Sequence, residues 1–508
     1  MQKLKLTGSA LSIDDVHQVA RHGRQVDKLE TSIRRGMEAS QGWVDAAVRS
    51  GDVIYGVTTG FGALATTSIA PAEARRLSRN LVLNCLAGVG EPLPVDLVRA
   101  MMLVRANSLA KGLSGIRPIV VETLIEMLNR GVTPVVPEKG SLGASGDLAP
   151  LAHIAVVLSR DLEEDGYSGE AWYREERMTG SAAMAAAEIP RLVLEAKEGL
   201  ALTNGTTFMA AAGALAVFDA HQLLEQAELA AALSFEALLG ITAALDPGLQ
   251  TANAQPGQSR TARNLLRLLD GSTLVDSATG KVQDAYSLRC TPQVLGPVHD
   301  ALEFIETRFG ACINAASDNP LIFIDPDGGR AVSGGNFHGG GPAMWLDFLG
   351  IAVSEVGSIS ERRTFRMLDP ALNGGLPSML VRRSGLDSGL MVPQYTAAAL
   401  VSDNKTLAHP DSVDSIPSSA NQEDHVSMGA NAARHALEIV ANVRNIIAIE
   451  LITAAQAVDL RPDGPARLGA GTGPAFRKIR SRVNFLEHDR ATSPDIEAVA
   501  QMLENGEI

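Results

Sequence analysis

Residues 208–239 read FMAAAGALAVFDAHQLLEQAELAAALSFEALL, an Ala- and Leu-rich stretch with apolar residues at helical spacing and only scattered charges. A segment of this length and pattern predicts one long, buried helix. Residues 344–363 and 432–458 share its composition and spacing. Three long apolar helices of this kind favour a mainly α fold built on a long antiparallel helix bundle.

The first 200 residues differ from this pattern, with short helical segments, Gly and Pro punctuation and few strand-like runs. After a polar stretch around Glu163, the run from Trp172 to Glu176 predicts a surface hairpin or another surface excursion before helices resume. We therefore expect an N-terminal, loop-rich region over residues 1–200 and a long-helix bundle over residues 201–508.

Composition excludes several classes of protein. The net charge of −14 argues against nucleic-acid and anionic-membrane partners, because no basic block offsets the acidic excess. Cys85, Cys290 and Cys312 lie far apart, which is typical neither of a metal site nor of a disulfide framework. The N-terminal residues lack the apolar core of a secretory signal, and the apolar stretches are too short or too interrupted to span a bilayer. We expect a soluble, cytoplasmic protein that contains no metal.

The chemistry is concentrated in residues 140–153, which read GSLGASGDLAPLAH. If the amide nitrogen of Gly146 attacks the carbonyl of Ala144 and water leaves, a five-membered ring forms. Loss of the Ser145 hydroxyl then leaves an exocyclic methylidene carbon, an electrophile that no ordinary side chain supplies. Glycine gives the attacking nitrogen the close approach that a Cβ would block. Three small residues in a loop are more often a simple turn, so the tripeptide alone is a weak signal.

The whole segment 140–153 resembles the signature of the histidine and phenylalanine ammonia-lyase family of aromatic amino acid lyases, and the chain is closest to its histidine branch. Further matches run from about residue 50 to about residue 460. The resemblance implies that Ala144, Ser145 and Gly146 form 4-methylidene-imidazole-5-one (MIO), with no metal. It also implies a homotetramer whose active sites are shared between subunits.

Other segments resemble the family's site residues. Tyr55, in a glycine-rich stretch, matches the tyrosine that removes the substrate's β-proton, and Asp147 either orients or deprotonates the ring-forming amide or caps the next helix. Ordinary structural roles exist for several of these residues: packing for Tyr55 and Phe337, and a helix cap for Asn204. The remaining implied positions are Asn204 near the prosthetic group, Arg289 as clamp of the substrate carboxylate, Tyr286 and Gln283 near the amine and ring, and Phe337 against the loop that cyclises.

Two segments bear on the substrate. Glu423, in SANQEDHVSM (residues 419–428), matches the form found in histidine lyases, whereas phenylalanine and tyrosine lyases carry glutamine there. A carboxylate suits the N–H of an imidazole and is poorly matched to a phenyl ring. Asn84 and Cys85 occupy the place that contacts the ring, but this pair is none of the pairs typical of the family, and Gly340-Gly341 replaces a common Glu-Pro. These departures weaken the histidine assignment but leave the reaction class unchanged.

We therefore predict a carbon–nitrogen lyase that eliminates ammonia from L-histidine to give trans-urocanate. The expected partners are a small amino acid and further copies of the same chain, with no nucleic acid and no membrane. Three alternatives stay open: a lyase for another aromatic or heteroaromatic amino acid, of the tyrosine or phenylalanine type; an MIO aminomutase that returns ammonia to the β-carbon; and a catalytically inactive helical scaffold that acts as an oligomeric binding protein.

Overall fold

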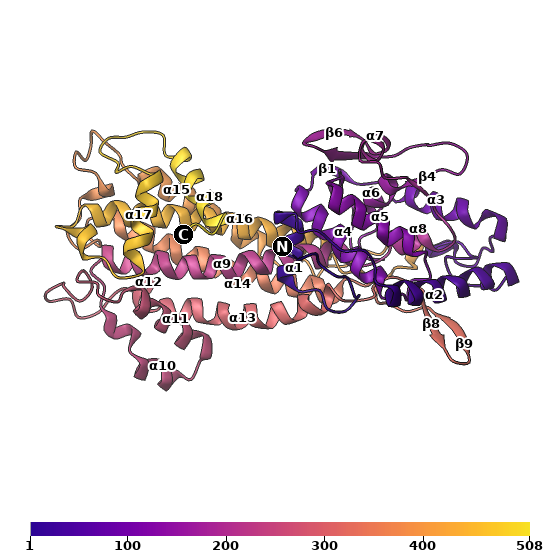
Figure 1. The fold of residues 1–508 in the computed structure, drawn as a ribbon. Helices are drawn as coiled ribbons and strands as arrows, with labels where there is room; N and C mark the ends of the chain where they lie inside the picture. Colours follow the sequence, from indigo (N-terminus) through magenta and orange to yellow (C-terminus); the bar gives the residue numbers. More distant parts are fainter. Residues whose placement is uncertain (1) are drawn as a thin grey trace. The chain divides into compact units, whose positions relative to one another are not determined.

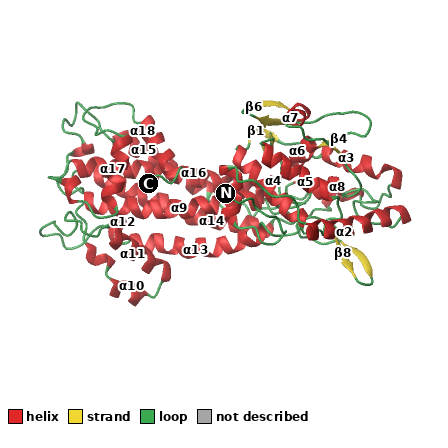
Figure 2. Ribbon diagram, viewed as in Figure 1, coloured by secondary structure: helices red, strands yellow, loops and turns green. Residues whose placement is uncertain are grey.

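The computed structural model describes residues 2–508 and is built mainly from helices, with a few short strands (Figure 1, Figure 2). The mainly α prediction is therefore confirmed. The chain forms two compact units. Unit 1 comprises Met1–Phe218, Glu306–Asp347 and Pro410–Arg434, and unit 2 comprises Asp219–Ile305, Phe348–His409 and His435–Ile508. Both units draw on several stretches of chain, and the expected boundary near residue 200 stays a prediction.

Unit 1 contains a set of short and medium helices around an apolar interior. Helix α4 is buried along almost its whole length and packs against α1 and α5, while α6 and α8 contact each other and α3. This follows from sequence, because α4 and α6 carry apolar residues on all sides. The helices are α1 (Ile13–His22), α2 (Thr31–Ser50), α3 (Ala74–Asn84), α4 (Val95–Ala110), α5 (Pro118–Arg130), α6 (Leu148–Leu158), α7 (Gly180–Ala186) and α8 (Glu198–Thr203).

The strands of unit 1 form small, separate sheets. The hairpin predicted around Trp172 is confirmed: β5 (Glu170–Tyr173) and β6 (Glu176–Thr179) pair antiparallel, with Trp172 opposite Arg177. A second antiparallel hairpin, β8 (Leu321–Asp325) and β9 (Gly328–Val332), contacts α2 through β8. The other strands are β1 (Val89–Pro92) with β3 (Pro137–Lys139), β2 (Thr133–Pro134) with β5, and β4 (Ser159–Arg160) with β7 (Leu192–Val193).

Long helices follow the three predicted stretches, as α9 (Thr207–Ala237), α14 (Gly340–Leu368) and α16 (Gly429–Asp459). Residues of these helices and of α13 (Thr291–Cys312) are divided between the two units. By length and composition α9 and α14 could cross a membrane, but 83% and 56% of their most apolar windows are buried inside the protein. The core helices of a globular protein have the same properties.

Unit 2 contains α10 (Pro247–Asn253), α11 (Pro256–Leu268), α12 (Tyr286–Arg289), α15 (Met391–Leu407), α17 (Thr472–Arg482) and α18 (Ser493–Glu504). A buried ion pair lies among its long helices: Nη2 of Arg363 is 2.9 Å from Oε2 of Glu450, and both side chains are inaccessible to solvent. The same carboxylate accepts hydrogen bonds from Ser234 (2.7 Å) and Ser360 (2.6 Å). These three partners of Glu450 compensate the desolvation of its buried charge and fix how α9, α14 and α16 pack within the unit.

Candidate functional site

The predicted tripeptide lies on a backbone cradle between the loop before α6 and the loop before α9. Gly146 pairs with Gly205 as an isolated parallel bridge, and the N–H of Asp147 donates to the carbonyl of Gly205 at 2.8 Å. The carbonyl of Ser145 accepts from the side-chain amide of Asn204 at 2.8 Å and from the N–H of Gly205 at 3.3 Å. A Cβ on Gly146, which has φ +75°, would lie 2.3 Å from the Gly205 carbonyl carbon. Glycine is therefore required here both for space and for conformation.

Asp147 is fully buried and performs a different capping role from the one predicted. It stands at the N-cap position of α6, yet its side chain makes no capping bond to that helix. Its carboxylate instead accepts from the backbone N–H groups of Phe208 (2.8 Å) and Met209 (3.2 Å), in the first turn of α9. The cap expected from Asn204 is thus supplied by Asp147 from elsewhere in the chain, which leaves Asn204 to hold Ser145. Burial raises the pKa of Asp147 to about 7, although the hydrogen bonds from Met209 and Phe208 oppose the shift.

Arg105, which was not predicted, supports the backbone that precedes Gly205. It is a fully buried residue of α4 whose guanidinium donates to the carbonyls of Ala201 and Asn204, the latter at 2.7 Å. Burial lowers its pKa to about 10. These bonds satisfy carbonyls at the end of α8 that have no partner within the helix. The signal in the sequence was an arginine directly after the apolar run of residues 100–104 in α4.

Ser427 and Met428, just before α16, form a second set of contacts with the tripeptide loop. The N–H of Met428 donates to the carbonyl of Leu142 at 2.9 Å, and the hydroxyl of Ser427 donates to the carbonyl of Gly143 at 3.3 Å. Leu142, Ala144 and Met428 also belong to one apolar cluster. Residues separated by most of the chain therefore hold the loop on its second side.

Glu423 lies directly against the tripeptide. The Ser145 hydroxyl donates to Oε1 of Glu423 at 2.7 Å, and the Ser418 hydroxyl donates to Oε2 at 2.6 Å. Burial, together with the negative charge of Glu423, raises the pKa of the Cys85 thiol to about 11, so Cys85 shares this environment. Asn84, at the end of α3, is exposed. The structure thus brings Ser145 and Glu423 together, and the charge of Glu423 reaches the thiol of Cys85.

The tyrosine loop adjoins the same segment. The hydroxyl of Tyr55 accepts from the N–H of Gly62 at 3.1 Å, and its half-buried ring contacts Phe61 edge-on with centroids 6.5 Å apart. The N–H of Ala63 donates to the hydroxyl of Ser419 at 3.1 Å. The loop that carries Tyr55 is therefore connected to the loop that carries Glu423.

Phe337 is half-buried in the glycine-rich loop before α14. The residue that follows it lies beside the segment before α16: Nε2 of His338 is 3.2 Å from the carbonyl of His425. A Cβ on Gly339 would lie 2.5 Å from the hydroxyl of Ser427. Gly339 thus allows close packing against Ser427, and the packing of Phe337 on the tripeptide loop stays a prediction.

Three predicted residues belong to unit 2, whereas the others belong to unit 1. Gln283 is exposed, and the Tyr286 side chain is 70% exposed. The guanidinium of Arg289 lies 4.6 Å from the centre of the Tyr286 ring, and its Nε is buried with no hydrogen-bond partner within residues 2–508. This cation has an unused donor, as a carboxylate clamp needs.

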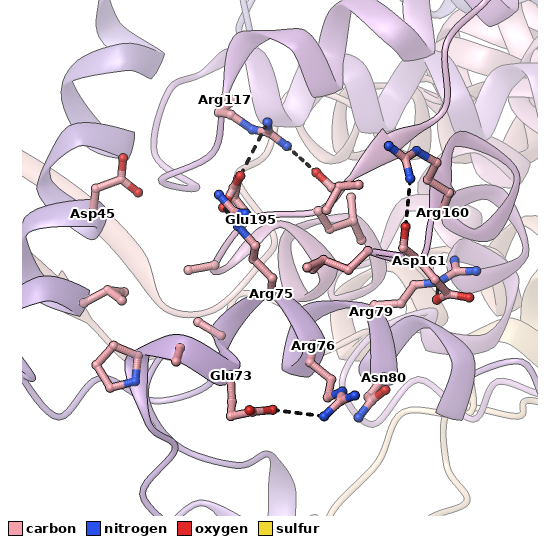
Figure 3. A pocket seen from close by; sticks show the side chains of 18 of the residues that line it. Asp45, Glu73, Arg75, Arg76, Arg79, Asn80, Arg117, Arg160, Asp161 and Glu195 are labelled. Carbon is pink, nitrogen blue, oxygen red and sulfur yellow. Dashed lines mark hydrogen bonds and ion pairs between the residues drawn. The ribbon is translucent and has the colours of Figure 1, made fainter. Parts of the chain in front are cut away.

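A separate cavity of unit 1, of about 1170 Å³, contains none of the predicted site residues (Figure 3). Its walls are arginine–carboxylate pairs, among them Arg75 with Glu195 and Arg79 with Asp161, each at 2.7 Å. Most of these charges neutralise one another. Within residues 2–508 no group of three His, Cys, Asp or Glu side chains is arranged to hold a metal ion.

Comparisons with known proteins agree with the predicted resemblance. A sequence profile described as "Aromatic amino acid lyase" matches residues 11–481. The histidine ammonia-lyase of Treponema denticola is 50% identical over 507 residues, covering 100% of this chain and 98% of that protein. The structure of a histidine ammonia-lyase from Trypanosoma cruzi is 38% identical with a TM-score of 0.89, covering 100% of this chain and 94% of that one. A tyrosine aminomutase from Streptomyces globisporus is 36% identical with a TM-score of 0.92, covering 100% and 97%.

Proposed function

Since the chain belongs to the aromatic amino acid lyase family, we propose that it is a histidine ammonia-lyase, which eliminates ammonia from L-histidine to give trans-urocanate. The observation that carries this proposal is the carboxylate of Glu423, which lies 2.7 Å from the hydroxyl of Ser145. A carboxylate beside the reacting residue suits a substrate ring that carries an N–H, and a phenyl ring would leave that charge without a partner.

The residues present fit the MIO group. Gly146 has a positive φ and lies so close to Gly205 that only glycine fits there, and Asn204 and Gly205 hold the Ser145 carbonyl without contacting its hydroxyl. Ala144, Ser145 and Gly146 would form the group, whose methylidene carbon makes the substrate nitrogen a better leaving group. Asp147, at the ring-forming peptide, is the candidate to orient the Gly146 amide.

Each remaining residue has an assigned task. Tyr55 removes the β-proton as general base. Arg289 holds the substrate carboxylate, and its buried Nε is a donor available for that purpose. Glu423 accepts the N–H of the substrate ring. The supporting positions are Asn204 beside the prosthetic group, Gln283 and Tyr286 near the amine and ring, Phe337 against the tripeptide loop, and Asn84 and Cys85 at the ring.

The alternatives are less well supported. The histidine ammonia-lyase of Treponema denticola is 50% identical to this chain, whereas the tyrosine aminomutase is 36% identical. Cys85 in place of a residue typical of histidine lyases is the reason to measure L-tyrosine and L-phenylalanine beside L-histidine. Retained Tyr55, Ser145 and Arg289 argue against an inactive scaffold.

The assembly is a homotetramer in this proposal, and the protein acts in the cytoplasm. Val282 is 92% exposed and Tyr286 70% exposed on the segment that carries Arg289. These two exposed side chains are available for contact with another chain. A neighbouring copy would then complete each site, and the mass of the purified protein in solution tests this.

The decisive experiment compares the wild type with Ser145→Ala. The wild type should turn over L-histidine in preference to L-tyrosine and L-phenylalanine, and its intact mass should be lower than that of the unmodified chain by two water molecules. Ser145→Ala, which has no hydroxyl to lose, should keep its circular dichroism spectrum and lose activity. Undiminished turnover in this variant, or a wild type with the mass of the unmodified chain, would overturn the proposal. Ser412→Ala, in the segment before Glu423, is the matched control.

A further inference from the structure

Ser418 and Glu423 form the base of a short loop and are bonded to each other three times. The N–H of Ser418 donates to the carbonyl of Glu423 at 3.0 Å, and the N–H of Glu423 donates to the carbonyl of Ser418 at 3.3 Å. The third bond joins the side chains, from the Ser418 hydroxyl to Oε2 of Glu423 at 2.6 Å. The two residues thus stand opposite each other as in an antiparallel strand pair, with both side chains on one side.

The two oxygens of the Glu423 carboxylate have different partners, and only one partner is permanent. Oε1 accepts from the hydroxyl of Ser145, the group that leaves as water when the tripeptide is processed. Oε2 accepts from Ser418, which processing does not change. Formation of the prosthetic group therefore releases Oε1 as an acceptor while Oε2 stays held.

We infer that Ser418 is a positioning residue for substrate recognition: it anchors Oε2 of Glu423 so that Oε1, freed from the Ser145 hydroxyl, accepts the N–H of the substrate ring. This inference rests on the proposed function. It explains why the ring acceptor stands beside the reacting residue, because Oε1 is directed there before the substrate arrives. A carboxylate with one oxygen anchored by a hydrogen bond loses less rotational freedom on binding than an unanchored one.

The surrounding loop gives the anchor its importance. Ser419, Ala420 and Asn421 all have positive φ, at 50°, 51° and 66°, a backbone conformation that non-glycine residues rarely adopt. Such a loop persists only where neighbouring contacts determine it. Its tip is held by the bond from Ala63 to Ser419, and its base by the three bonds between Ser418 and Glu423. The Glu423 side chain is only half-buried, so packing alone does not fix its direction.

The test compares Ser418→Ala with Ser418→Thr. Ser418→Ala should raise KM for L-histidine and lower the preference for L-histidine over L-phenylalanine about tenfold, the effect of one hydrogen bond to a charged group. Prosthetic-group content, measured by intact mass and ultraviolet absorbance, should equal that of the wild type. Ser418→Thr keeps the hydroxyl in extended backbone and should restore KM and selectivity. Ser412→Ala, whose backbone rather than side chain is bonded to Asp347, should match the wild type.

A double-mutant cycle with Glu423→Gln separates this inference from the proposed function. If Ser418 acts through Glu423, the effects of the two substitutions on kcat/KM are non-additive for whichever amino acid the enzyme prefers. Additive effects, or Ser418→Ala with unchanged KM and selectivity, would overturn the inference. A wild type that prefers L-tyrosine or L-phenylalanine would overturn the histidine assignment, and the cycle would still report whether Ser418 acts through Glu423.

Discussion

The substitution Asp147→Asn tests how the cradle of the tripeptide is stabilised. The carboxylate of Asp147 is fully buried and accepts two N–H groups at the start of α9. Burial raises its pKa from 3.8 to about 7. The folded protein therefore binds this proton more tightly than the unfolded chain does. The contribution of Asp147 to stability is complete below the unfolded pKa and is lost as the pH rises toward the folded pKa.

The magnitude follows from the size of the shift. Between about pH 5 and about pH 8, ionisation of Asp147 should lower the free energy of unfolding by roughly 2.5 kcal/mol. Each pH unit over which the folded chain keeps this proton and the unfolded chain has lost it contributes about 1.4 kcal/mol. Asparagine keeps an oxygen that accepts from the first turn of α9 but does not ionise. The stability of Asp147→Asn relative to the parent protein should therefore increase by that amount over the same range of pH.

The assay is denaturant unfolding at the two pH values. Both proteins carry Ser145→Ala, so that the folded and unfolded chains have the same covalent structure. Asp327→Asn, at the exposed turn between β8 and β9, is the control and should show no such dependence on pH. A difference between Asp147→Asn and its parent that does not change with pH would refute the reasoning, because it would mean that burial does not dominate the ionisation of this carboxyl.

Three further substitutions test the site. Gly146→Ala should destabilise the protein by at least ~2 kcal/mol and abolish prosthetic-group formation, because its Cβ would lie 2.3 Å from the Gly205 carbonyl; thermal unfolding and intact mass check this. Tyr55→Phe should lower kcat by at least about 100-fold. Its melting temperature should change little, because the substitution removes a single hydrogen bond within residues 2–508, the one from Gly62; a kcat near that of the wild type would exclude the tyrosine as base. Arg289→Lys should raise KM and lower kcat/KM for L-histidine about tenfold or more, because an ammonium cannot bind a carboxylate in two parallel bonds. Unchanged KM there would argue that Arg289 does not bind the carboxylate.

Much of the fold could be predicted because its signals are local. The Ala- and Leu-rich stretches that became α9, α14 and α16 carry their helical period in the order of their residues. The run from Trp172 to Glu176 likewise indicated a surface hairpin or excursion, and β5 and β6 form the hairpin there. The bounds of such elements depend on neighbouring residues, which the sequence shows directly.

The site could be predicted only as a set of residues. Ala144, Ser145 and Gly146 suggest ring closure once the surrounding segment 140–153 is taken with them, because the whole signal lies in consecutive residues. The supporting residues were missed or misassigned: Asp147 caps α9 and not α6, and Arg105 and Ser418 carried no motif. Hydrogen bonds of this kind depend on which backbone groups remain unpaired once helix ends meet.

The sequence by itself determined that this protein is mainly helical and that it carries a tripeptide capable of becoming an electrophile. Tertiary structure decided that Glu423 bonds to Ser145 across 278 residues of chain and that Ser418 holds the other carboxylate oxygen. Helical periodicity and peptide cyclisation are properties of neighbouring residues, so they can be read along the chain. The direction of a carboxylate depends on donors from other segments, and only the folded arrangement brings those donors within hydrogen-bond distance.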